Sequence, residues 1–499
     1  MKFFIIISLL IGVSFNSFSQ KRGAVWCFGD SALVDFRDTS NILTGQSIVK
    51  SRGTSVSISD SIGNLIMYAY TRAGVNGNTT RLINNQDSLI EFGDSIVGEG
   101  WYRELIIMPY PDSSLHILFS IGVTGSSQQG FYYSIVDMSL NGGLGEVIQK
   151  NVQLENFKTV DCLTAIKHGN GRDWWVLFRR IDGPSSPNND FYLYLVTSGG
   201  VVVQNIQSIG SQNATNSGRI SFNSTGTRMS YINYKGLIEL YDFDRCTGLI
   251  NNPVTIEPEN TQPPWSGFWS AEFSPSGNIL YVTGIPAVVT DSSRLFQYDL
   301  MATNISSSKL ILWSTPWMIT IDQLKMAPDD KMYLTTNYYQ IYPYQDTMYN
   351  NINMNLSVIN SPDSLGFACD LQPFSFYLGG KRSYAGLPNN PDYDLSSLVG
   401  SPCDTLTSLN EIAPVNVAGL YVYYSPQWQT TFINADKLSG TTYRLSVYDL
   451  MGKEVFSESG KITSPYYTKN LNCTGWAKGM YVVRLECGTE KLVKKFLIE

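Results

Sequence analysis

Short apolar runs separated by tight polar turns follow one another along most of the chain. Six stretches share one order: an apolar strand, a turn built from Pro, Asp, Ser, Asn or Gly, and a second strand rich in Tyr, Val, Leu and Ile. Each stretch predicts a β-hairpin, because Gly and Asn accept positive φ while Pro and Asp fix the start of a turn. The hairpins span residues 57–68, 107–119, 165–178, 220–232, 271–283 and 324–336.

The hairpins recur at a nearly constant spacing. Their turns are about fifty to sixty residues apart, and they lie near Gly63, Ser113, Gly171, Gly226, Gly277 and Asp330. Further apolar strands lie between them, at 131–138, 191–197, 237–243 and 294–300. Two hairpins per period give the four strands of a propeller blade. The pattern therefore predicts an all-β fold with a β-propeller of six blades, or seven if the strand at 23–29 completes another. A pair of β-sandwiches is the alternative.

One of the hairpins carries a family resemblance. The stretch F-S-P-S-G-N-I-L-Y-V, residues 273–282, resembles the repeats of TolB-like and related bacterial β-propellers. The resemblance covers the inner hairpin of each blade. It implies a fold and no particular function.

The two ends of the chain differ from this repeating middle part. At the N-terminus a lysine precedes an apolar run at 3–13, which predicts a signal peptide (1–19) cleaved between Ser19 and Gln20. That run is too short for a membrane anchor, and no other stretch predicts one. The stretch 378–404 is rich in Gly, Pro, Ser and Asn, which predicts blade closure and then a linker. The predicted domains are a propeller (20–382), a linker (383–414) and a small C-terminal β-sandwich (415–499).

Charge also separates the C-terminal sandwich from the rest. Residues 415–499 hold ten Lys and Arg against seven Asp and Glu, whereas the remaining chain holds 25 against 35. A basic module on an acidic body indicates a separate task. The net charge of −7 for the whole chain argues against nucleic acid as a partner.

Three stretches of the C-terminal sandwich carry a second resemblance. V-Y-D-L-M-G-K-E-V (447–455), G-M-Y-V-V-R-L (479–485) and K-L-V-K-K-F (491–496) look like the type A sorting domain of the type IX secretion system. The family's usual Tyr-Pro-Asn-Pro opening is replaced by Y-Y-S-P-Q-W-Q at 423–429. The resemblance implies the type IX secretion machinery as a partner, and a product that is secreted or held at the cell surface. It implies as recognition residues Gly479, Tyr481, Arg484, Lys491, Lys494 and Lys495. The alternative for Lys494 and Lys495 is a solvated strand edge.

The seven cysteines form no CxxC pair, so the sequence does not indicate a zinc site. Cys473 and Cys487 flank the strand around Val482 and are the nearest candidates for a disulfide in an oxidising compartment. An odd number of cysteines leaves at least one thiol unpaired or paired between chains.

The sequence indicates no catalytic residue. Neither of the two histidines, His116 in a strand and His168 in a turn, accompanies a G-x-S-x-G, H-E-x-x-H or P-loop motif. Three acidic pairs occur, at 242 and 244, 329 and 330, and 392 and 394. The pair at 329–330 is typical of a turn. The pair at 242 and 244 would suit only calcium, and its spacing departs from an EF-hand, so no cofactor is assigned.

Aromatic residues cluster before three of the predicted inner strands. Such loops meet at one mouth of a propeller channel, where aromatic rings stack on sugars. The candidate ligand-binding residues are Trp101, Tyr102, Trp265, Phe268, Trp269 and Trp317. The alternative is that these rings pack between blades.

These observations favour an exported propeller that binds polysaccharide or another surface polymer. A propeller-type glycan hydrolase or lyase is a second hypothesis. A structural partner of surface proteins is a third.

Overall fold

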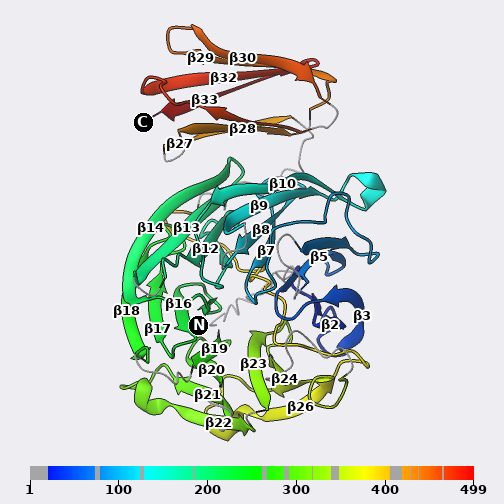
Figure 1. Cartoon of the computed structure of the whole chain (residues 1–499), viewed down its shortest axis with the longest axis vertical. Helices are drawn as coiled ribbons and strands as arrows, with labels where there is room; N and C mark the ends of the chain where they lie inside the picture. Colours follow the sequence, from blue (N-terminus) through cyan, green and yellow to red (C-terminus); the bar gives the residue numbers. More distant parts are fainter. Residues whose placement is uncertain are drawn as a thin grey trace, which may run out of the picture.

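A ring of seven small sheets with a two-sheet sandwich beside it makes up the protein (Figure 1). The structure is a computed structural model that describes residues 21–72, 79–123, 128–183, 186–260, 267–285, 291–316, 318–338, 348–404, 418–426, 429–436, 438–462 and 466–498. No helix in these ranges is long and apolar enough to cross a membrane.

The seven sheets of the ring are the blades of a propeller. The first blade has β1 (Val25–Phe28), β2 (Asp30–Asp35) and β3 (Leu43–Lys50), and the second has β4 (Ser55–Ser59), β5 (Leu65–Thr71) and β6 (Thr80–Asn84). The third has β7 (Leu105–Pro109), β8 (His116–Gly122), β9 (Gly130–Asp137) and β10 (Glu146–Glu155); the fourth has β11 (Thr164–Lys167), β12 (Trp174–Arg179), β13 (Asn188–Thr197) and β14 (Gly200–Asn213). The fifth has β15 (Gly218–Phe222), β16 (Arg228–Asn233), β17 (Ile238–Phe243) and β18 (Ile250–Glu257). The sixth has β19 (Gly267–Phe273), β20 (Ile279–Ile285), β21 (Ser293–Asp299) and β22 (Leu310–Thr315); the seventh has β23 (Ile319–Met326), β24 (Met332–Tyr338), β25 (Asn355–Ile359) and β26 (Leu371–Tyr377). Three short 3-10 helices, η1 (Asn141–Gly143), η2 (Ser306–Ser308) and η3 (Gly366–Cys369), lie in connections.

All six predicted hairpins form the inner strand pairs of blades two to seven. Each pairs antiparallel, and the turn positions Gly226, Gly277 and Asp330 have φ of 70°, 72° and 61°. The ring closes where Trp26 of the first blade packs edge-on against Tyr333 of the seventh, with ring centroids 6.0 Å apart. The predicted propeller is therefore confirmed, with seven blades.

The first blade lacks an inner strand of its own. Ser51 N–H donates to Gly29 O and Ser59 N–H to Arg22 O, so β1 runs antiparallel to the neighbouring inner strand β4. An inner strand would run parallel to β4, and in the first blade that place is taken by residues 383–395, which we call the plug. The plug enters beside Asp30, whose N–H donates to Arg382 O at 2.9 Å.

The plug runs inside the ring, because it contacts the inner strands of several blades. Ala385 N–H donates to Arg52 O and Asn389 N–H to Ser55 O, both next to β4. The Asn389 side chain donates to Leu105 O and Leu163 O, each at 3.0 Å, in the third and fourth blades. The sequence predicts a linker from residue 383, but residues 383–404 lie against the propeller. The backbone hydrogen-bonding groups of this irregular segment pair with the inner strands. Local composition does not reveal such pairing.

A disulfide fastens the chain where it leaves the channel. Cys403 is bonded to Cys246, which follows β17 and lies 157 residues earlier in the chain. The predicted pair Cys473 and Cys487 is wrong, since both are free and buried. Cys473 lies before the start of β32 and Cys487 at its far end, so the length of that strand separates them.

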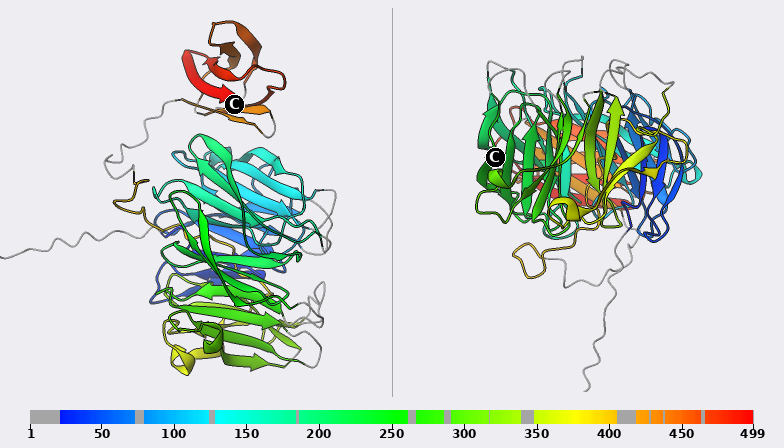
Figure 2. Two further views of the ribbon diagram at one scale, coloured as in Figure 1. Left: turned by 90° about the vertical axis from the view of Figure 1, so that its left-hand side faces the viewer. Right: turned by 90° about the horizontal axis from the view of Figure 1, so that it is seen from below.

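The C-terminal sandwich packs two antiparallel sheets face to face. One contains β27 (Gly419–Ser425), β28 (Thr430–Asp436) and β31 (Tyr467–Asn472); the other has the order β30 (Glu454–Lys461), β29 (Thr442–Asp449), β32 (Gly479–Cys487) and β33 (Glu490–Ile498). Figure 2 shows the sandwich next to the outer strands of the propeller. Gln149 Nε2 donates to Thr468 Oγ1 at 2.8 Å, and the Tyr466 hydroxyl donates to Asp137. The predicted sandwich is confirmed.

Candidate ligand site in the propeller channel

An aromatic pair spans the channel at the end where the plug enters, which we call the inlet mouth. Tyr102 precedes β7 of the third blade, and Trp269 lies near the start of β19 of the sixth. Their ring centroids are 4.5 Å apart with an interplanar angle of 76°. Tyr102 is buried and Trp269 is half-buried. Two residues far apart in the sequence thus form an edge-to-face contact over the channel.

Close glycine contacts fit the plug beneath this pair. A Cβ on Gly386 would lie 1.9 Å from Gly53 O, and a Cβ on Gly53 would lie 2.1 Å from the Tyr102 ring. Arg52 Nε donates to the Tyr102 hydroxyl at 2.5 Å, and its guanidinium lies 5.0 Å from that ring's centroid. Glycine at both positions therefore lets the plug pass directly under Tyr102.

Three buried carboxylates lie around the inlet mouth. Glu104 accepts the backbone N–H groups of Glu99 and Gly100, and Asp161 accepts those of Tyr102 and Arg103. Burial raises the pKa of Glu104 to about 8 and that of Asp161 to about 6. Both carboxylates hold the loop that presents Tyr102.

The third carboxylate, Asp322 in β23, is less engaged. Its Oδ2 has no hydrogen-bond partner among the described residues. Burial raises the pKa of Asp322 to about 7, an effect that Thr320 and Arg52 oppose.

A cavity of about 370 Å³ lies between the plug and the inner strands of blades four to seven. It reaches the exposed turn residues Ser224 and Asp330 at the other end of the channel, which we call the outlet mouth. Its charged lining residues are Arg103, Arg219, Glu272, Lys325, Asp330, Asp392 and Asp394.

The inner end of the cavity is rich in cations. Arg219 pairs with Glu272 and also donates to Leu324 O at 3.0 Å. Lys325 Nζ donates to the plug carbonyl of Asn390 at 2.9 Å. Burial lowers the pKa of Lys325 to about 8, and the neighbouring guanidinium groups of Arg219 and Arg103 act in the same direction while Glu272 opposes them. These cations face a cavity whose outer rim is acidic.

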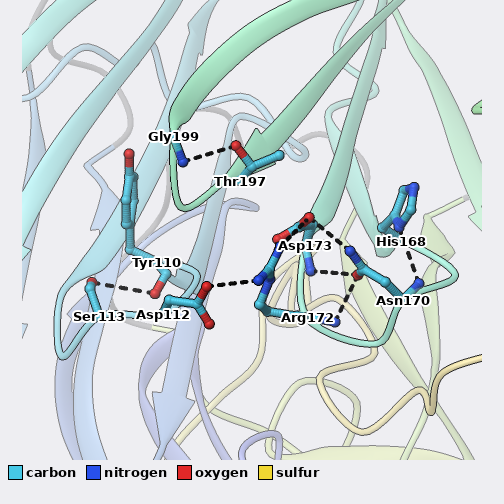
Figure 3. Close-up of polar contacts among 9 residues, drawn as sticks. All are labelled: Tyr110, Asp112, Ser113, His168, Asn170, Arg172, Asp173, Thr197 and Gly199. Carbon is cyan, nitrogen blue, oxygen red and sulfur yellow. Dashed lines mark hydrogen bonds and ion pairs between the residues drawn. The ribbon is translucent and has the colours of Figure 1, made fainter. Parts of the chain in front are cut away.

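Polar turns of the third and fourth blades hold one another through side-chain contacts (Figure 3). Arg172 bridges the third and fourth blades, since it pairs with Asp112 at 2.8 Å and with Asp173 at 2.7 Å. His168 Nε2 donates to Cys246 O, 2.9 Å away, and its Nδ1 accepts the Asn170 N–H. His168 is thus a turn residue that joins the fourth blade to the cystine.

The structure separates the predicted aromatic residues. Tyr102 and Trp269 come together at the inlet mouth, whereas Phe268 is buried between blades five and six, with its ring 6.0 Å from Phe296. Trp101 is half-buried against the core of the third blade. Trp265 and Trp317 lie outside the described residues.

The remaining candidates for chemistry have structural contacts. Asp244 accepts Cys246 N–H at 2.8 Å, and Asp242 accepts from Asn252 at 2.8 Å. Asp329 accepts the Tyr333 hydroxyl at 2.9 Å. His116 is buried, and burial lowers its pKa to about 4. Within the described ranges no group of three or more His, Cys, Asp and Glu is arranged to hold a metal ion.

The predicted sorting residues lie on the last two strands of the sandwich. Tyr481 is buried, stacks on Phe496 with centroids 5.5 Å apart, and donates to Ala477 O. Gly479 opens β32 with φ of 143°, and Arg484 pairs with Glu486. The three lysines, Lys491, Lys494 and Lys495, are exposed on β33.

Residues 421–499 match the family described as the secretion system C-terminal sorting domain. This module is a type IX secretion sorting domain. The match assigns the sorting domain to the type IX secretion machinery, and with the propeller it makes the chain an exported propeller protein. Secretion by this route delivers a protein to the cell surface or the extracellular space. No curated protein matches the chain in sequence.

Solved structures resemble the chain in fold alone. The Dos1 propeller is 10% identical over 84% of this chain and 90% of its own, with a TM-score of 0.39. A Quinonprotein alcohol dehydrogenase-like protein from Bacteroides thetaiotaomicron is 10% identical over 68% and 73%, with a TM-score of 0.37. A luciferin-regenerating enzyme is 11% identical over 74% and 98%, with a TM-score of 0.34. At such values the neighbours say nothing about activity or ligand.

Sequence reasoning missed the cations of the channel. The signal for them was a charged residue within several otherwise apolar inner strands: Lys167 in T-A-I-K, Arg219 in G-R-I-S-F, Glu272 in A-E-F and Lys325 in L-K-M. A charge in a strand that lines a closed ring points into the channel or pairs there.

Proposed function

We propose that this exported protein acts at the cell surface or outside the cell as a binding protein for polysaccharide or another surface polymer. The proposed ligand site is the inlet mouth, with Tyr102 and Trp269 at its centre. Trp101, Trp265 and Trp317 stay candidates from the sequence alone. The proposed export route begins with the signal peptide at 1–19 and its cleavage between Ser19 and Gln20.

The contact between Tyr102 and Trp269 carries this proposal. It holds a half-buried indole over the channel from two blades that lie on different sides of the ring. A fixed aromatic face of this kind suits a sugar ring, whose C–H groups stack on it. The plug passes beneath Tyr102, so a ligand would meet the ring pair from outside the channel and with one unit of a polymer.

Binding is favoured over hydrolysis because the nearby carboxylates are engaged. A glycosidase needs two carboxyl groups, on either side of the scissile bond. Glu104 and Asp161 each accept two backbone N–H groups. Of these three carboxylates, Asp322 is the one with an oxygen that has no hydrogen-bond partner among the described residues, and its pKa is about 7. The enzyme hypothesis therefore depends on Asp322.

The test is a binding screen of glycans and surface polymers on the mature protein, read by tryptophan fluorescence. Trp269→Ala should weaken a saturable hit by about fivefold or more, because stacked aromatic contacts contribute about 1 kcal/mol each beyond burial. The matched control is Trp313→Ala in β22, the outermost strand of the same blade, where the ring packs on Phe374. This control should leave affinity unchanged.

Three other outcomes would redirect the proposal. Equal loss in both tryptophan variants would mean that blade packing, and not the inlet mouth, determines the result. Turnover of the ligand that Asp322→Asn abolishes would favour the hydrolase or lyase. Absence of any glycan hit together with co-purification of surface proteins would favour a structural partner.

A further inference from the structure

Arg103 is a buried cation that forms no salt bridge with any described residue. Arg103 is only 6% exposed. Among the described residues, its guanidinium donates one hydrogen bond, to Asn389 Oδ1 at 3.4 Å. No carboxylate in the described ranges lies within 4.0 Å of its guanidinium. Arginine does not give up its proton in proteins, so the charge stays. Burying an unpaired charge costs free energy. A protein therefore keeps such a charge mainly where a bound ligand or ion of opposite charge pairs with it.

The guanidinium of Arg103 lines the channel cavity together with two more cations. Arg219 and Lys325 line the same cavity of about 370 Å³, and Glu272 is the carboxylate among the described residues that lines it at this inner end. The buried Asp161 accepts Arg103 N–H and attracts Arg103 from outside the cavity, so three positive charges face two negative ones and a surplus of one remains at the inner end. Burial and the neighbouring cations also lower the pKa of Lys325 to about 8. A bound anion would offset this destabilisation of the charged lysine.

The outer rim of the cavity has the opposite charge. Asp330, Asp392 and Asp394 line it and are exposed. Although the residue is exposed, partial desolvation of the Asp394 carboxyl beside the cavity and the charge of Asp392 raise its pKa to about 6, whereas Lys167 and Arg22 oppose the shift. A ligand with a negative charge at both ends would be repelled here, and one with a neutral or positive outer end would not.

We propose that the channel cavity is a binding site for a small molecule that carries one oxyanion, held by Arg103 with Arg219 and Lys325, and an uncharged or cationic opposite end. The oxyanion is a carboxylate, a sulfate or a phosphate, each of which suits the fork of donors on a guanidinium. The cavity has the volume of a small-molecule site. The ligand enters from the outlet mouth, past Ser224, with its oxyanion first. This site is separate from the aromatic inlet mouth.

The experiment is calorimetry on the full mature chain at low salt with four probes. Inorganic sulfate supplies the oxyanion alone, glucuronate adds a neutral sugar body, glucose lacks the charge, and glucarate has a carboxylate at both ends. We expect saturable binding of sulfate and glucuronate, none of glucose, and about tenfold weaker binding of glucarate than of glucuronate. Absence of saturable binding by both sulfate and glucuronate would overturn the proposal.

Arg103→Gln tests the residue that carries the argument. The change removes the charge at similar length, so affinity for glucuronate should fall at least tenfold. Without ligand the variant should melt at a higher temperature than the wild type, because an unpaired buried charge has been removed. A purely structural role for Arg103 predicts the reverse, a lower melting temperature with affinity unchanged, and that result would overturn the proposal.

Two control variants separate this site from other effects. Arg81→Gln makes the same substitution at the one exposed side chain of β6 and should change neither affinity nor melting temperature. Trp269→Ala should leave glucuronate binding intact, since the inlet mouth is not used. Failure of the oxyanion site would therefore leave the polymer-binding proposal standing, and failure of polymer binding would leave the oxyanion site.

Discussion

The propeller and the sorting domain place their charged side chains differently. The propeller buries arginines and carboxylates, among them Arg103, Glu104, Asp161, Arg219 and Asp322. In the sorting domain every described charged residue is exposed or half-buried, and the buried core consists of apolar side chains and a few hydroxyls. Both regions are antiparallel β-structures, so the fold type alone does not decide where charge goes.

The difference follows from the closed ring. A propeller encloses a channel, and that channel can hold water, a plug or a ligand next to polar side chains. A two-sheet sandwich encloses only its own apolar layer, and its polar residues point outward. Internal charges in the propeller therefore face the channel or its plug, whereas external charges on the sorting domain face the surroundings of the protein.

The largest expected effect concerns delivery. A chain without residues 415–499 should be retained in the periplasm almost completely, because the propeller then carries no recognition surface for the secretion machinery. Western blots of the culture medium, surface and periplasm measure this. Export of the truncated chain at the level of the full chain would contradict the role of the sorting domain.

Point variants sharpen the same prediction. Replacing Lys491, Lys494 and Lys495 by Ala should leave the melting of the sorting domain nearly unchanged, since all three are exposed. Export should fall several-fold if these lysines are recognised. Unchanged export would make them a solvated strand edge.

The second effect concerns the plug. Cys403→Ser should lower the free energy of unfolding of the propeller by about 3–5 kcal/mol, because the bond closes a long loop and fixes the outlet end of the plug. Differential scanning calorimetry should show the propeller transition shifting downward and the sorting-domain transition unmoved. A reductant should shift the wild type to the same position and leave the variant unchanged, since the five other cysteines are free. A reductant effect of equal size on both proteins would contradict this account.

Local pattern explains which parts of this architecture could be predicted. The six hairpins and the terminal strands depend on turn residues and alternation within about a dozen positions, and the structure confirms both. The course of the plug depends on contacts such as that of Asn389 with Leu105 and Leu163, more than two hundred residues away. No local pattern encodes that, and a Gly- and Pro-rich composition fits a linker equally well.

Local sequence pattern also could not predict which residues come together at the candidate site. The aromatic residues were visible in the sequence, but only the ring brings Tyr102 to Trp269 and buries Phe268 between blades. The pairing of Cys246 with Cys403 likewise follows from the exit path of the plug. Sequence neighbours suggested Cys473 and Cys487, which the long strand β32 keeps apart.

The smallest effect tests whether the charges buried in the propeller make its stability depend on pH. The pKa of Asp322 in the folded chain is about 7, above its ordinary value, because of burial. Its contribution to stability is therefore fully present at low pH and is lost as pH rises through 7. Asp322→Asn removes this loss. Relative to the wild type, the variant should gain about 2 kcal/mol of propeller stability between pH 5 and pH 8. This gain is roughly half of the free energy that corresponds to the whole pKa shift of Asp322.

Urea unfolding at both pH values measures this gain as the difference between variant and wild type. Glu104 and Asp161 titrate in both proteins, so their contributions cancel in that difference. The sorting-domain transition is an internal control, because its described charged side chains lie at the surface and Asp322 does not contact them. An unchanged difference between pH 5 and pH 8 would mean that Asp322 is already charged at pH 5. Arg52 would then be the ionic partner of Asp322. In that case the buried charge of Asp322 would not make propeller stability depend on pH, and the two domains would not differ in this respect.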